Sequence, residues 1–500
     1  MKRFFAILTL AVSVAFGARA VDITLTQPGT LASQIGQETS ASTLKVTGPI
    51  DVRDIDFIAD KMTSLTSLDL SAATVRAYDG KRKGSSQTNF LADELPTMSF
   101  AGMKLTSIKL PATLKTIGDG AFALTSITGI EIPSSVSEIR SGAFSNCPQL
   151  KSIVIPATVV TAGHALFRDC PALTDATFMP SRLGARTFAG CKALKNVTLG
   201  NDVTSIGEGA FADCVSLTTV SYSGSSLREI GDYAFYHTGL KSLNMAGGND
   251  EITTIGAWAF AENASLTKLE LAPRVYSLGE GALFNDGALQ TFSSPVGYTT
   301  VGDLAFSGTS SLNATNVLSE TTRTIGRYAL TDMESMQYVI LPPALTRIGE
   351  HAFEGWTGLR EMNAPSIETV PALGDDVWNG LDKSKIALAV PEKLIDSFKN
   401  ADQWKEFNIR NASDDTTMGD NILADDFAIS ARFDGQVIMV SGNDNLSSVE
   451  VYDTLGRLLT SVAANGTDHV AIDTSRWSTR VYIVRAISSD GLTASVKTAR

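Results

Sequence analysis

The stretch I-R-S-G-A-F-S-N-C-P-Q-L-K-S-I-V-I-P, residues 139–156, decides how this chain folds, because close copies of it recur along the sequence. One copy begins at Ile206 and another at Ile255, and both follow the frame I-G-x-x-A-F-x-x-C/N-x-x-L-x-x-I-x-I-P. The phenylalanine of the frame returns every 21 to 25 residues, twice replaced by leucine, at Phe100, Phe122, Phe144, Phe167, Phe188, Phe211, Phe235, Phe260, Leu283, Phe306, Leu330 and Phe353. Self-similarity at this period is typical of repeat proteins.

Each repeat contains one strand and one compact return segment. In L-x-x-I-x-I the last two apolar residues alternate with another residue, which is the periodicity of a strand. Leu150, Ile153 and Ile155 are therefore expected to point inward, and Lys151 and Val154 outward. The proline that follows the strand cannot donate to a ladder and marks its end. The I-G-x-x-A-F stretch is expected to form a helical or irregular return, with its alanine and phenylalanine in the core.

One repeat buries too little apolar surface to be stable alone, so neighbouring repeats must stack into a continuous core with one long parallel sheet. The open ends of such an array need caps. Residues 21–98 are expected to hold the N-terminal cap, with strands at 44–46 and 68–70 and a helix at 52–61. The array is expected to span 99–410, with a last strand at 386–391 and a closing amphipathic helix at 394–407.

The N-terminus has the features of an export signal. Lys2 and Arg3 precede an apolar run over residues 4–16, and Ala18-Arg19-Ala20 gives the small-x-small pattern of a cleavage site. Residues 1–20 are therefore predicted to be a signal peptide. No later run reaches the roughly 18 apolar residues of a membrane span, so the mature chain is not expected to cross a membrane. The formal net charge of −12 argues against nucleic acid as a partner.

The sequence changes character after the repeats. Residues 411–426 are polar and acidic, as in a linker. Residues 427–500 contain short strand patterns separated by turn signals such as Asp434-Gly435 and Asn465-Gly466. These patterns predict a small all-β domain, with a sandwich as the expected architecture.

The repeat resembles the BspA-like class of bacterial leucine-rich repeats over roughly residues 25–410. The last domain is similar to the sorting domain of the type IX secretion system, on Val449-Glu-Val-Tyr-Asp453, Leu455-Gly-Arg457 and Val481-Tyr-Ile-Val484, although Arg480 stands where such domains usually have glycine. The resemblance implies an α/β leucine-rich-repeat solenoid followed by a β-sandwich. It also implies secretion to the cell surface of a Gram-negative bacterium and adhesion to a host or bacterial surface protein or glycan.

Four cysteines, Cys147, Cys170, Cys191 and Cys214, lie three residues after the phenylalanine in four successive repeats. Stacked neighbours would be within disulfide reach, and export permits oxidation. Other repeats place asparagine, threonine or methionine at or beside this position, which favours a column of reduced, buried thiols. The C-x-x-C spacing of a zinc site is missing.

Two surfaces are candidates for binding. The outward strand positions, which run from Lys109 to Asn363, are mostly small and polar, which suits weak or extended contact but equally an ordinary hydrated strand. The second surface lies two residues before the phenylalanine, where Tyr233, Trp258, Tyr328 and His351 form a column together with Leu304, interrupted by Gly281. This column is either an exposed contact stripe for a protein or glycan, or packing against the adjacent repeat.

No nucleophile elbow, phosphate loop or metalloprotease motif occurs, and the four histidines are scattered, so neither catalysis nor a cofactor or metal is expected. Two hypotheses follow. The chain is an exported adhesin that engages the secretion machinery through its last domain, or it is a periplasmic or envelope scaffold that holds glycan or partner proteins.

Overall fold

The computed structural model describes residues 11–15, 18–82, 86–245, 251–271, 274–293, 297–312, 318–334, 336–412, 429–434, 436–453, 458–475, 477, 481–488 and 493–499. Most of the predicted signal peptide and of the predicted linker lies outside the described residues. The chain forms two compact units, the first made of residues 1–312 and 328–333, and the second of residues 313–327 and 334–500.

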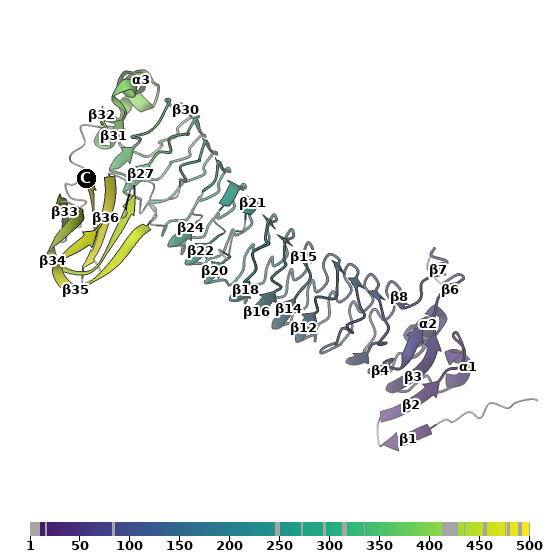
Figure 1. Cartoon of the computed structure of the whole chain (residues 1–500). Helices are drawn as coiled ribbons and strands as arrows, with labels where there is room; N and C mark the ends of the chain where they lie inside the picture. Colours follow the sequence, from purple (N-terminus) through teal and green to yellow (C-terminus); the bar gives the residue numbers. More distant parts are fainter. Residues whose placement is uncertain are drawn as a thin grey trace, which may run out of the picture. The chain divides into compact units, whose positions relative to one another are not determined.

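The first unit begins with the cap that the sequence predicts. Helix α1 (Leu31–Ile35) precedes strand β3 (Thr43–Ile50), and helix α2 (Val52–Lys61) follows this strand. All neighbouring strands of the cap sheet run parallel except β1 and β2 (Figure 1). In order, these strands are β1 (Ala11–Ala15), β2 (Ala18–Thr24), β3 (Thr43–Ile50), β4 (Ser67–Asp69) and β9 (Ser107–Lys109), with β5 (Ala73–Val75) beside the end of β3. The predicted strands and helix of the cap are confirmed.

The cap depends on two buried aspartates at the start of α2. Asp51 is the N-cap and forms a capping box with Asp54. The carboxylate of Asp54 also reaches out of the helix, where it accepts hydrogen bonds from the backbone N–H groups of Gly29, 2.6 Å away, and Leu31, 2.9 Å away. Asp54 therefore ties the segment before α1 to the first turn of α2.

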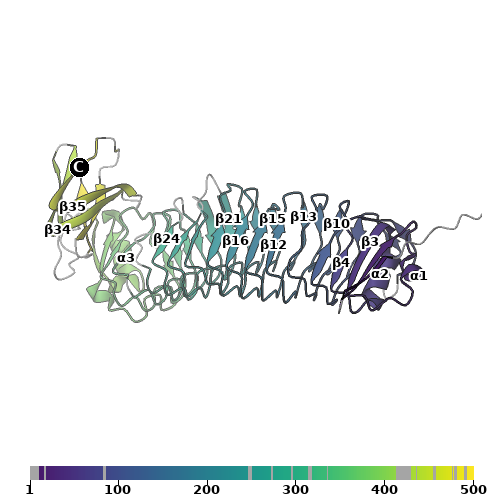
Figure 2. The same ribbon diagram turned by 90° about the horizontal axis from the view of Figure 1, so that it is seen from below.

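The predicted strands of the repeats form parallel ladders in exact repeat register, so that Ile153, Ala176, Val197 and Val220 are aligned. As expected, Ile153 and Ile155 are buried whereas Val154 is 58% exposed. Figure 2 shows these strands side by side on successive repeats. They form two sheets, one of β12 (Ser152–Ile155), β14 (Asp175–Phe178), β16 (Asn196–Leu199) and β18 (Thr219–Ser221), and one of β20 (Ser242–Asn244), β22 (Lys268–Glu270) and β24 (Thr291–Ser293).

A second parallel ladder forms at the isoleucine of the frame. The sequence predicts a helical or irregular return at this position, and not a strand. It contains β8 (Glu94–Leu95), β10 (Thr116–Ile117), β11 (Glu138–Ile139), β13 (Thr161–Ala162), β15 (Arg182–Leu183), β17 (Ser205–Ile206), β19 (Glu229–Ile230), β21 (Glu251–Ile255), β23 (Arg274–Leu278) and β25 (Thr300–Val301), with a break between β13 and β15. Between the cap and the regular repeats lies a small antiparallel pair of strands, β6 (Tyr78–Asp79) and β7 (Asn89–Phe90).

The glycine after this isoleucine is explained by close approach of successive repeats. A Cβ on Gly207 would lie 2.7 Å from the backbone nitrogen of Ala185, and one on Gly256 would lie 2.4 Å from that of Asp232. Both distances are shorter than any tolerable contact. Two positions of this ladder lack the glycine, Pro96 and Arg140. The guanidinium of Arg140 pairs with Glu94 at 2.9 Å and with Glu138 at 3.1 Å.

The phenylalanines of the frame form a stacked column in the core. From Phe100 to Phe260, neighbouring rings lie 5.1 to 5.6 Å apart, with planes within 26° of parallel. Offset stacking of this kind adds to the hydrophobic energy of burial. The backbone extends the same column, since the N–H of Phe122 donates to Ala143 O in the next repeat and that of Phe144 to Leu166 O.

The four cysteines are free and buried in the structure, as the sequence predicts. Each thiol donates to the carbonyl of the phenylalanine in the preceding repeat, Cys147 to Phe122 O at 3.1 Å and Cys191 to Phe167 O at 3.0 Å. Asn263 occupies the same position and donates through Nδ2 to Phe235 O at 3.0 Å. The four cysteines and Asn263 thus each donate a hydrogen bond from this position to the preceding repeat.

Asp286, the next residue of this column, can donate such a hydrogen bond only when it is protonated. Its Oδ1 accepts from Asn263 N–H at 2.8 Å, and its Oδ2 is buried without a hydrogen-bond partner. Burial raises the pKa of Asp286 well above its usual range. A protonated carboxyl supplies a donor like that of the neighbouring Asn263, whereas a carboxylate does not.

We expect Asp286→Asn to stabilise the protein at neutral pH by about 1 kcal/mol or more, since each unit of pKa difference is worth about 1.4 kcal/mol. The folded-state pKa is raised, so the wild type carries no penalty below the unfolded-state pKa near 4. The penalty grows as pH rises above that value and is complete at the folded-state pKa. Urea unfolding from pH 3 to 8 measures this, with exposed Asp332→Asn as the control. An advantage of the Asp286 variant that is constant with pH would contradict the assignment.

The second unit contains strands of both ladders and a C-terminal cap. One ladder has β26 (Thr324–Ile325), β28 (Arg347–Ile348) and β30 (Ala372–Leu373), and the other has β27 (Tyr338–Ile340), β29 (Glu361–Asn363), β31 (Ala387–Val390) and β32 (Asn408–Asn411). The array contains one more repeat than predicted. Trp378 continues the phenylalanine column and stacks on Phe353, with ring centroids 4.8 Å apart. The predicted strand at 386–391 is present as β31.

The predicted closing helix at 394–407 is only partly formed. Helix α3 (Ile395–Asn400) is flanked by short 3-10 turns at η1 (Lys383–Lys385), η2 (Glu392–Leu394) and η3 (Trp404–Glu406). The helix ends at Asn400 because Ala401 is extended, with a φ of −85° and a ψ of 138°. Beyond it, Gln403 has a positive φ of 59°, and its amide binds the last repeat, accepting from Val377 N–H and donating to Gly374 O. Phe398, Trp404 and Phe407 are buried.

The C-terminal region is the antiparallel β-domain that the sequence predicts. Its sheet runs β33 (Ile429–Asp434), β34 (Val437–Asp453), β36 (Val481–Ser488) and β37 (Thr493–Ala499), with β35 (Leu458–Asp473) also paired to β34. Strand β34 is longer than the short strands that the sequence predicts, and its pairing with β35 has register shifts between Ser441 and Ser448. Residues 454–457 and 478–480, which carry part of the sorting-domain resemblance, lie outside the described residues.

Candidate functional site

The column of Tyr233, Trp258, Tyr328 and His351 lies at a special backbone position. In every repeat, the residue two before the frame phenylalanine has a positive φ. The values are 55° for Tyr233, 57° for Trp258 and 53° for both Tyr328 and His351. Glycine fills the position at Gly120, Gly142, Gly209 and Gly281. A large side chain in this left-handed conformation costs about 1 to 2 kcal/mol, so these aromatics are kept at an energetic cost.

The side chain at this position lies over the same position of the next repeat. A Cβ on Gly281 would be 2.6 Å from the indole of Trp258, and one on Gly120 would be 2.6 Å from Met98 Sδ. The interruption of the column by Gly281 is therefore required by Trp258. The indole also packs against Phe284, with ring centroids 5.3 Å apart. Trp258 is half-buried and has a packing role.

Tyr233 differs from the other members of the column because it is 42% exposed. Its ring lies edge-on to Tyr236, with centroids 5.7 Å apart. Both tyrosines line a surface hollow of about 390 Å³ on the turn side of the repeats. The hollow is also lined by Arg168, Asp169, Arg186, Glu208 and Asp213, besides small residues.

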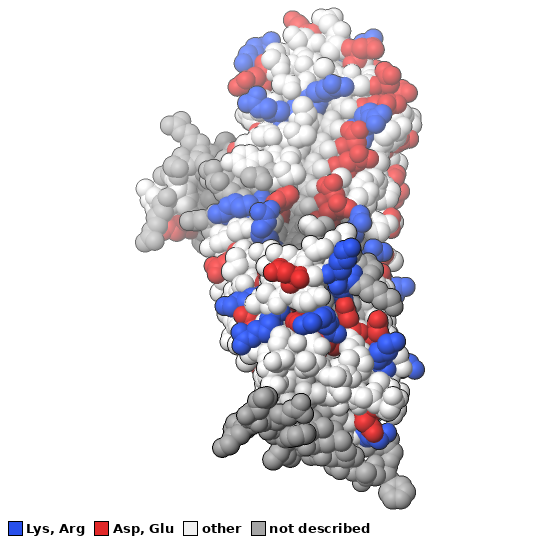
Figure 3. All heavy atoms as spheres, turned by 90° about the vertical axis from the view of Figure 1, so that its right-hand side faces the viewer, with Lys and Arg blue, Asp and Glu red and all other residues white. Residues whose placement is uncertain are grey.

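Charges of both signs alternate around this hollow. Arg186 pairs with Glu208 at 2.7 Å, and Arg168 with Asp169 at 3.1 Å. Partial burial, together with nearby Glu262 and Asp213, raises the pKa of Tyr236, so its phenol stays protonated and can donate a hydrogen bond. On the face shown in Figure 3, basic and acidic side chains likewise lie beside one another without gathering by sign.

The structure brings together only part of the predicted column. Tyr233 and Trp258 lie on successive repeats, joined by a hydrogen bond from Tyr233 N–H to Ala257 O at 2.9 Å. Tyr328 is half-buried and belongs to the first unit. His351, in the second unit, lies beside Glu354, with Nδ1 2.9 Å from Oε2.

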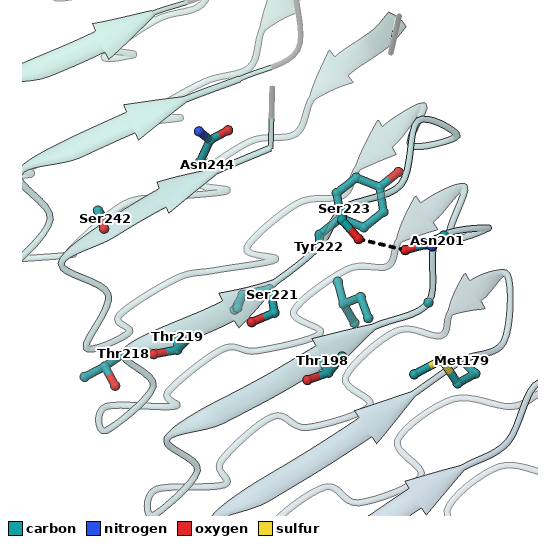
Figure 4. Close-up of a pocket in the computed structure, with 13 residues that line it drawn as sticks. Met179, Thr198, Asn201, Thr218, Thr219, Ser221, Tyr222, Ser223, Ser242 and Asn244 are labelled. Atoms are coloured by element: carbon teal, nitrogen blue, oxygen red, sulfur yellow. Dashed lines mark hydrogen bonds between the residues drawn. The ribbon is translucent and has the colours of Figure 1, made fainter. Parts of the chain in front are cut away.

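A second hollow, of about 640 Å³, lies on the outward face of the strands (Figure 4). Outward residues of successive strands line it, namely Thr198, Thr219, Ser221, Ser242 and Asn244. Tyr222 stands at its edge, where its hydroxyl accepts from the N–H groups of Ser226 and Leu227. The sequence predicts the outward positions but not the hollow. The signal for the hollow in the sequence is the longer repeat that contains Tyr222.

One outward position is wrongly predicted. Asn363 on β29 is only 3% exposed, and its register partner Ala389 on β31 is fully buried. Arg410 on β32 pairs with Glu361 on β29 at 3.1 Å. Because β31 lies between these two strands, the ion pair crosses over its outward face.

The described residues show neither a metal-binding group of three or more His, Cys, Asp or Glu side chains nor a helix that is long and apolar enough to cross a membrane.

Stacked repeats with a parallel strand in each define a leucine-rich-repeat solenoid. Four overlapping matches to the model described as BspA type leucine rich repeat region, at residues 93–182, 181–313, 253–385 and 323–426, cover most of the chain. The chain belongs to this BspA-type family.

One solved structure supports the fold, and others are similar over much of the chain with lower scores. A leucine-rich repeat protein from Bacteroides ovatus matches with a TM-score of 0.53 and 20% identity, covering 81% of this chain and all of its own. A leucine-rich cell surface protein from Faecalibacterium prausnitzii matches with a TM-score of 0.29 and 18% identity, over 72% of this chain and 94% of its own. The pneumococcal vaccine antigen PcpA has a TM-score of 0.28 and 14% identity, over 81% of this chain and 95% of its own. None of the curated proteins compared with the sequence matches it.

Proposed function

We propose that this chain is an exported, non-enzymatic leucine-rich-repeat protein that adheres to other proteins at the cell surface. The observation that carries the proposal is the hollow around Tyr233. An exposed tyrosine is held there in a costly backbone conformation, beside a second tyrosine and two arginines. Tyrosine and arginine are the residues that most often dominate protein interfaces.

The exposure of the Tyr233 ring favours a binding role over a packing role. Trp258, at the same position one repeat later, covers its neighbours, whereas Tyr233 leaves much of its surface open to solvent. The exposed ring of Tyr233 lies beside Tyr236 and two arginines, which is the combination of side chains that protein interfaces favour.

Export and delivery form the second part of the proposal. Residues 1–20 have the composition of a signal peptide, and the C-terminal β-domain resembles a type IX sorting domain. We assign this domain to contact with the secretion machinery of a Gram-negative outer membrane, followed by its removal.

Protease shaving of intact cells, with mass spectrometry of the mature C-terminus, tests delivery. Repeat peptides released from the surface, and a mature chain ending within about 410–430, are expected. A protected full-length chain that ends at Arg500 would overturn surface display. It would instead support the periplasmic scaffold, which predicts retention with envelope glycan or protein components.

The role of Tyr233 is tested by Tyr233→Gly. Glycine relieves the left-handed strain, so the free energy of unfolding is expected to stay within about 1 kcal/mol of the wild type. Adhesion to a panel of immobilised host matrix proteins and whole bacterial cells is expected to fall about tenfold or more, as for an interface hot spot. Urea unfolding and surface plasmon resonance measure the two effects.

Met98→Gly is the matched control, because Met98 is an exposed residue at the same backbone position, with a φ of 59°. It lies outside the hollow and is expected to leave adhesion unchanged. Adhesion that survives Tyr233→Gly, or that falls equally in both variants, would refute the assignment of the hollow.

A further inference from the structure

The hollow around Tyr233 has a floor of small residues and an aromatic wall. Two consecutive repeats contribute the floor, which consists of Ala189, Gly190, Gly209 and Ala212. The repeat that follows contributes the wall, formed by Tyr233 and Tyr236. Because glycine and alanine have little or no side chain, a bound chain can approach the backbone of the floor closely.

The two tyrosines of the wall form a corner. Their ring planes meet at 73°, with centroids 5.7 Å apart. The ring of Tyr233 is 42% exposed and that of Tyr236 is half-buried, so aromatic surface faces the hollow. The face of an aromatic ring is negative and attracts a cation that lies within about 6 Å of its centroid. An angled pair of rings suits a compact cation better than the flat ring of a sugar.

Two carboxylates lie near this corner, one in each adjacent repeat. Asp213 precedes Tyr236 by one repeat and Glu262 follows it by one, both at the position two residues after the frame phenylalanine. The N–H of Asp213 donates to Tyr236 O at 3.0 Å, which holds the aspartate beside the tyrosine. Burial, together with the charges of Glu262 and Asp213, raises the pKa of the Tyr236 phenol. The corner is therefore negative as well as aromatic.

Neither carboxylate pairs with a lysine or arginine among the described residues. Asp213 contacts Nδ1 of His237 at 2.9 Å, and Glu262 accepts from Nδ2 of Asn285 at 2.9 Å. The two arginines that line the hollow are already held in ion pairs with other acidic residues. The tyrosine corner is thus left with an excess of negative charge, which a cationic side chain of a partner complements.

We propose that the hollow binds an arginine side chain of a partner protein, with its guanidinium against Tyr233 and Tyr236 and facing Asp213 and Glu262. This inference rests on the proposed protein-binding function and specifies the partner surface as basic. Arginine fits better than lysine, because its flat guanidinium stacks on an aromatic ring while its N–H groups bind carboxylates. The partner's backbone then lies over the small residues of the floor.

The probe is the blocked peptide acetyl-Gly-Ser-Arg-Ser-Gly-amide, titrated into the full-length chain and followed by ligand-observed nuclear magnetic resonance. Saturable binding at millimolar concentration is expected. Citrulline in place of the arginine keeps the shape of the side chain without its charge, and is expected to weaken binding about tenfold. Glutamate at the same place is expected to abolish binding, because the corner repels it.

Asp213→Asn combined with Glu262→Gln removes both charges with little change in size. The double variant is expected to bind the arginine peptide about fivefold more weakly. Asparagine occurs naturally at this frame position, as Asn146 and Asn285, so the fold is expected to be retained. Asp332→Asn is the matched control, because Asp332 has the same frame position and a φ of 61°, against 60° for Asp213, but does not line the hollow. It is expected to leave binding unchanged.

No peptide binding at millimolar concentration, equal binding of the arginine and citrulline peptides, or full binding by the double variant would overturn the inference. So would binding of a neutral glucose hexasaccharide, in place of the peptide, that Tyr233→Gly abolishes. Adhesion that falls in Tyr233→Gly but persists in the double carboxylate variant would leave the proposed function intact while this inference fails.

Discussion

Phe188→Ala is expected to lower the free energy of unfolding by about 3 to 5 kcal/mol, the cost of emptying a large aromatic site in a packed core. Phe188 is fully buried and stacks between Phe167 at 5.3 Å and Phe211 at 5.6 Å. The edge of Phe178 closes a third side at 6.4 Å. The cavity cannot collapse easily, because the backbone of successive repeats is fixed by hydrogen bonds such as Phe188 N–H to Ala210 O.

Urea unfolding followed by circular dichroism measures this effect. Phe188→Leu is the matched control, since leucine fills the same position naturally at Leu283. It is expected to cost less than about 1.5 kcal/mol, as for other swaps that nearly conserve volume. Equal costs for the alanine and leucine variants would show that the column is not held together by its packing.

Asp54→Ala is expected to cost about 3 kcal/mol or more, because it leaves three backbone donors without their acceptor. The carboxylate accepts from Leu31 and Gly29 before the helix and from Asp51, 3.0 Å away, at its start. Burial raises the pKa of Asp54, although the three donors act in the opposite direction. Each buried N–H left unsatisfied costs about 1 to 3 kcal/mol.

Asp54→Asn separates hydrogen bonding from packing. Asparagine keeps one acceptor oxygen in the same volume, so it is expected to lose less than the alanine variant. Limited proteolysis near Gly29 should rise with the loss of stability, since the segment before α1 is tied down through Asp54. An alanine variant as stable and as protease-resistant as the wild type would contradict this role of the carboxylate.

The repeat architecture could be predicted because each element is specified locally. The L-x-x-I-x-I spacing predicts inward Ile153 and Ile155 and outward Val154, and twelve copies in register predict a stack. The second ladder was missed, because a strand of two residues such as Ser205–Ile206 is too short to show periodicity. The closing helix is shorter than predicted, because the chain becomes extended at Ala401 and then binds the last repeat through Gln403, and contacts between residues so far apart in sequence leave no local pattern.

The candidate sites were predictable only in part. Register along the frame is enough to place Tyr233 and Trp258 in one column. It does not reveal that the column has positive φ, since glycine, the usual sign, occurs in only some repeats. Exposed Tyr233 and packed Trp258 also look alike in sequence, because the difference depends on what the next repeat offers. The hollow on the outward face of the strands was not predicted, because its lining comes from successive repeats whose packing is not visible in any one of them.

The reactivity of the buried cysteines can report local opening of the repeats that contain them. Burial raises the pKa of Cys191 to about 12, so almost no reactive thiolate exists while its repeat is closed. All four thiols lie in residues 147–214, whereas the five tryptophans lie at residue 258 and beyond. Thiol labelling therefore reports when the N-terminal repeats open, and tryptophan fluorescence reports on later parts of the chain. Comparing the two rates would show whether the stack melts as one body or from one end.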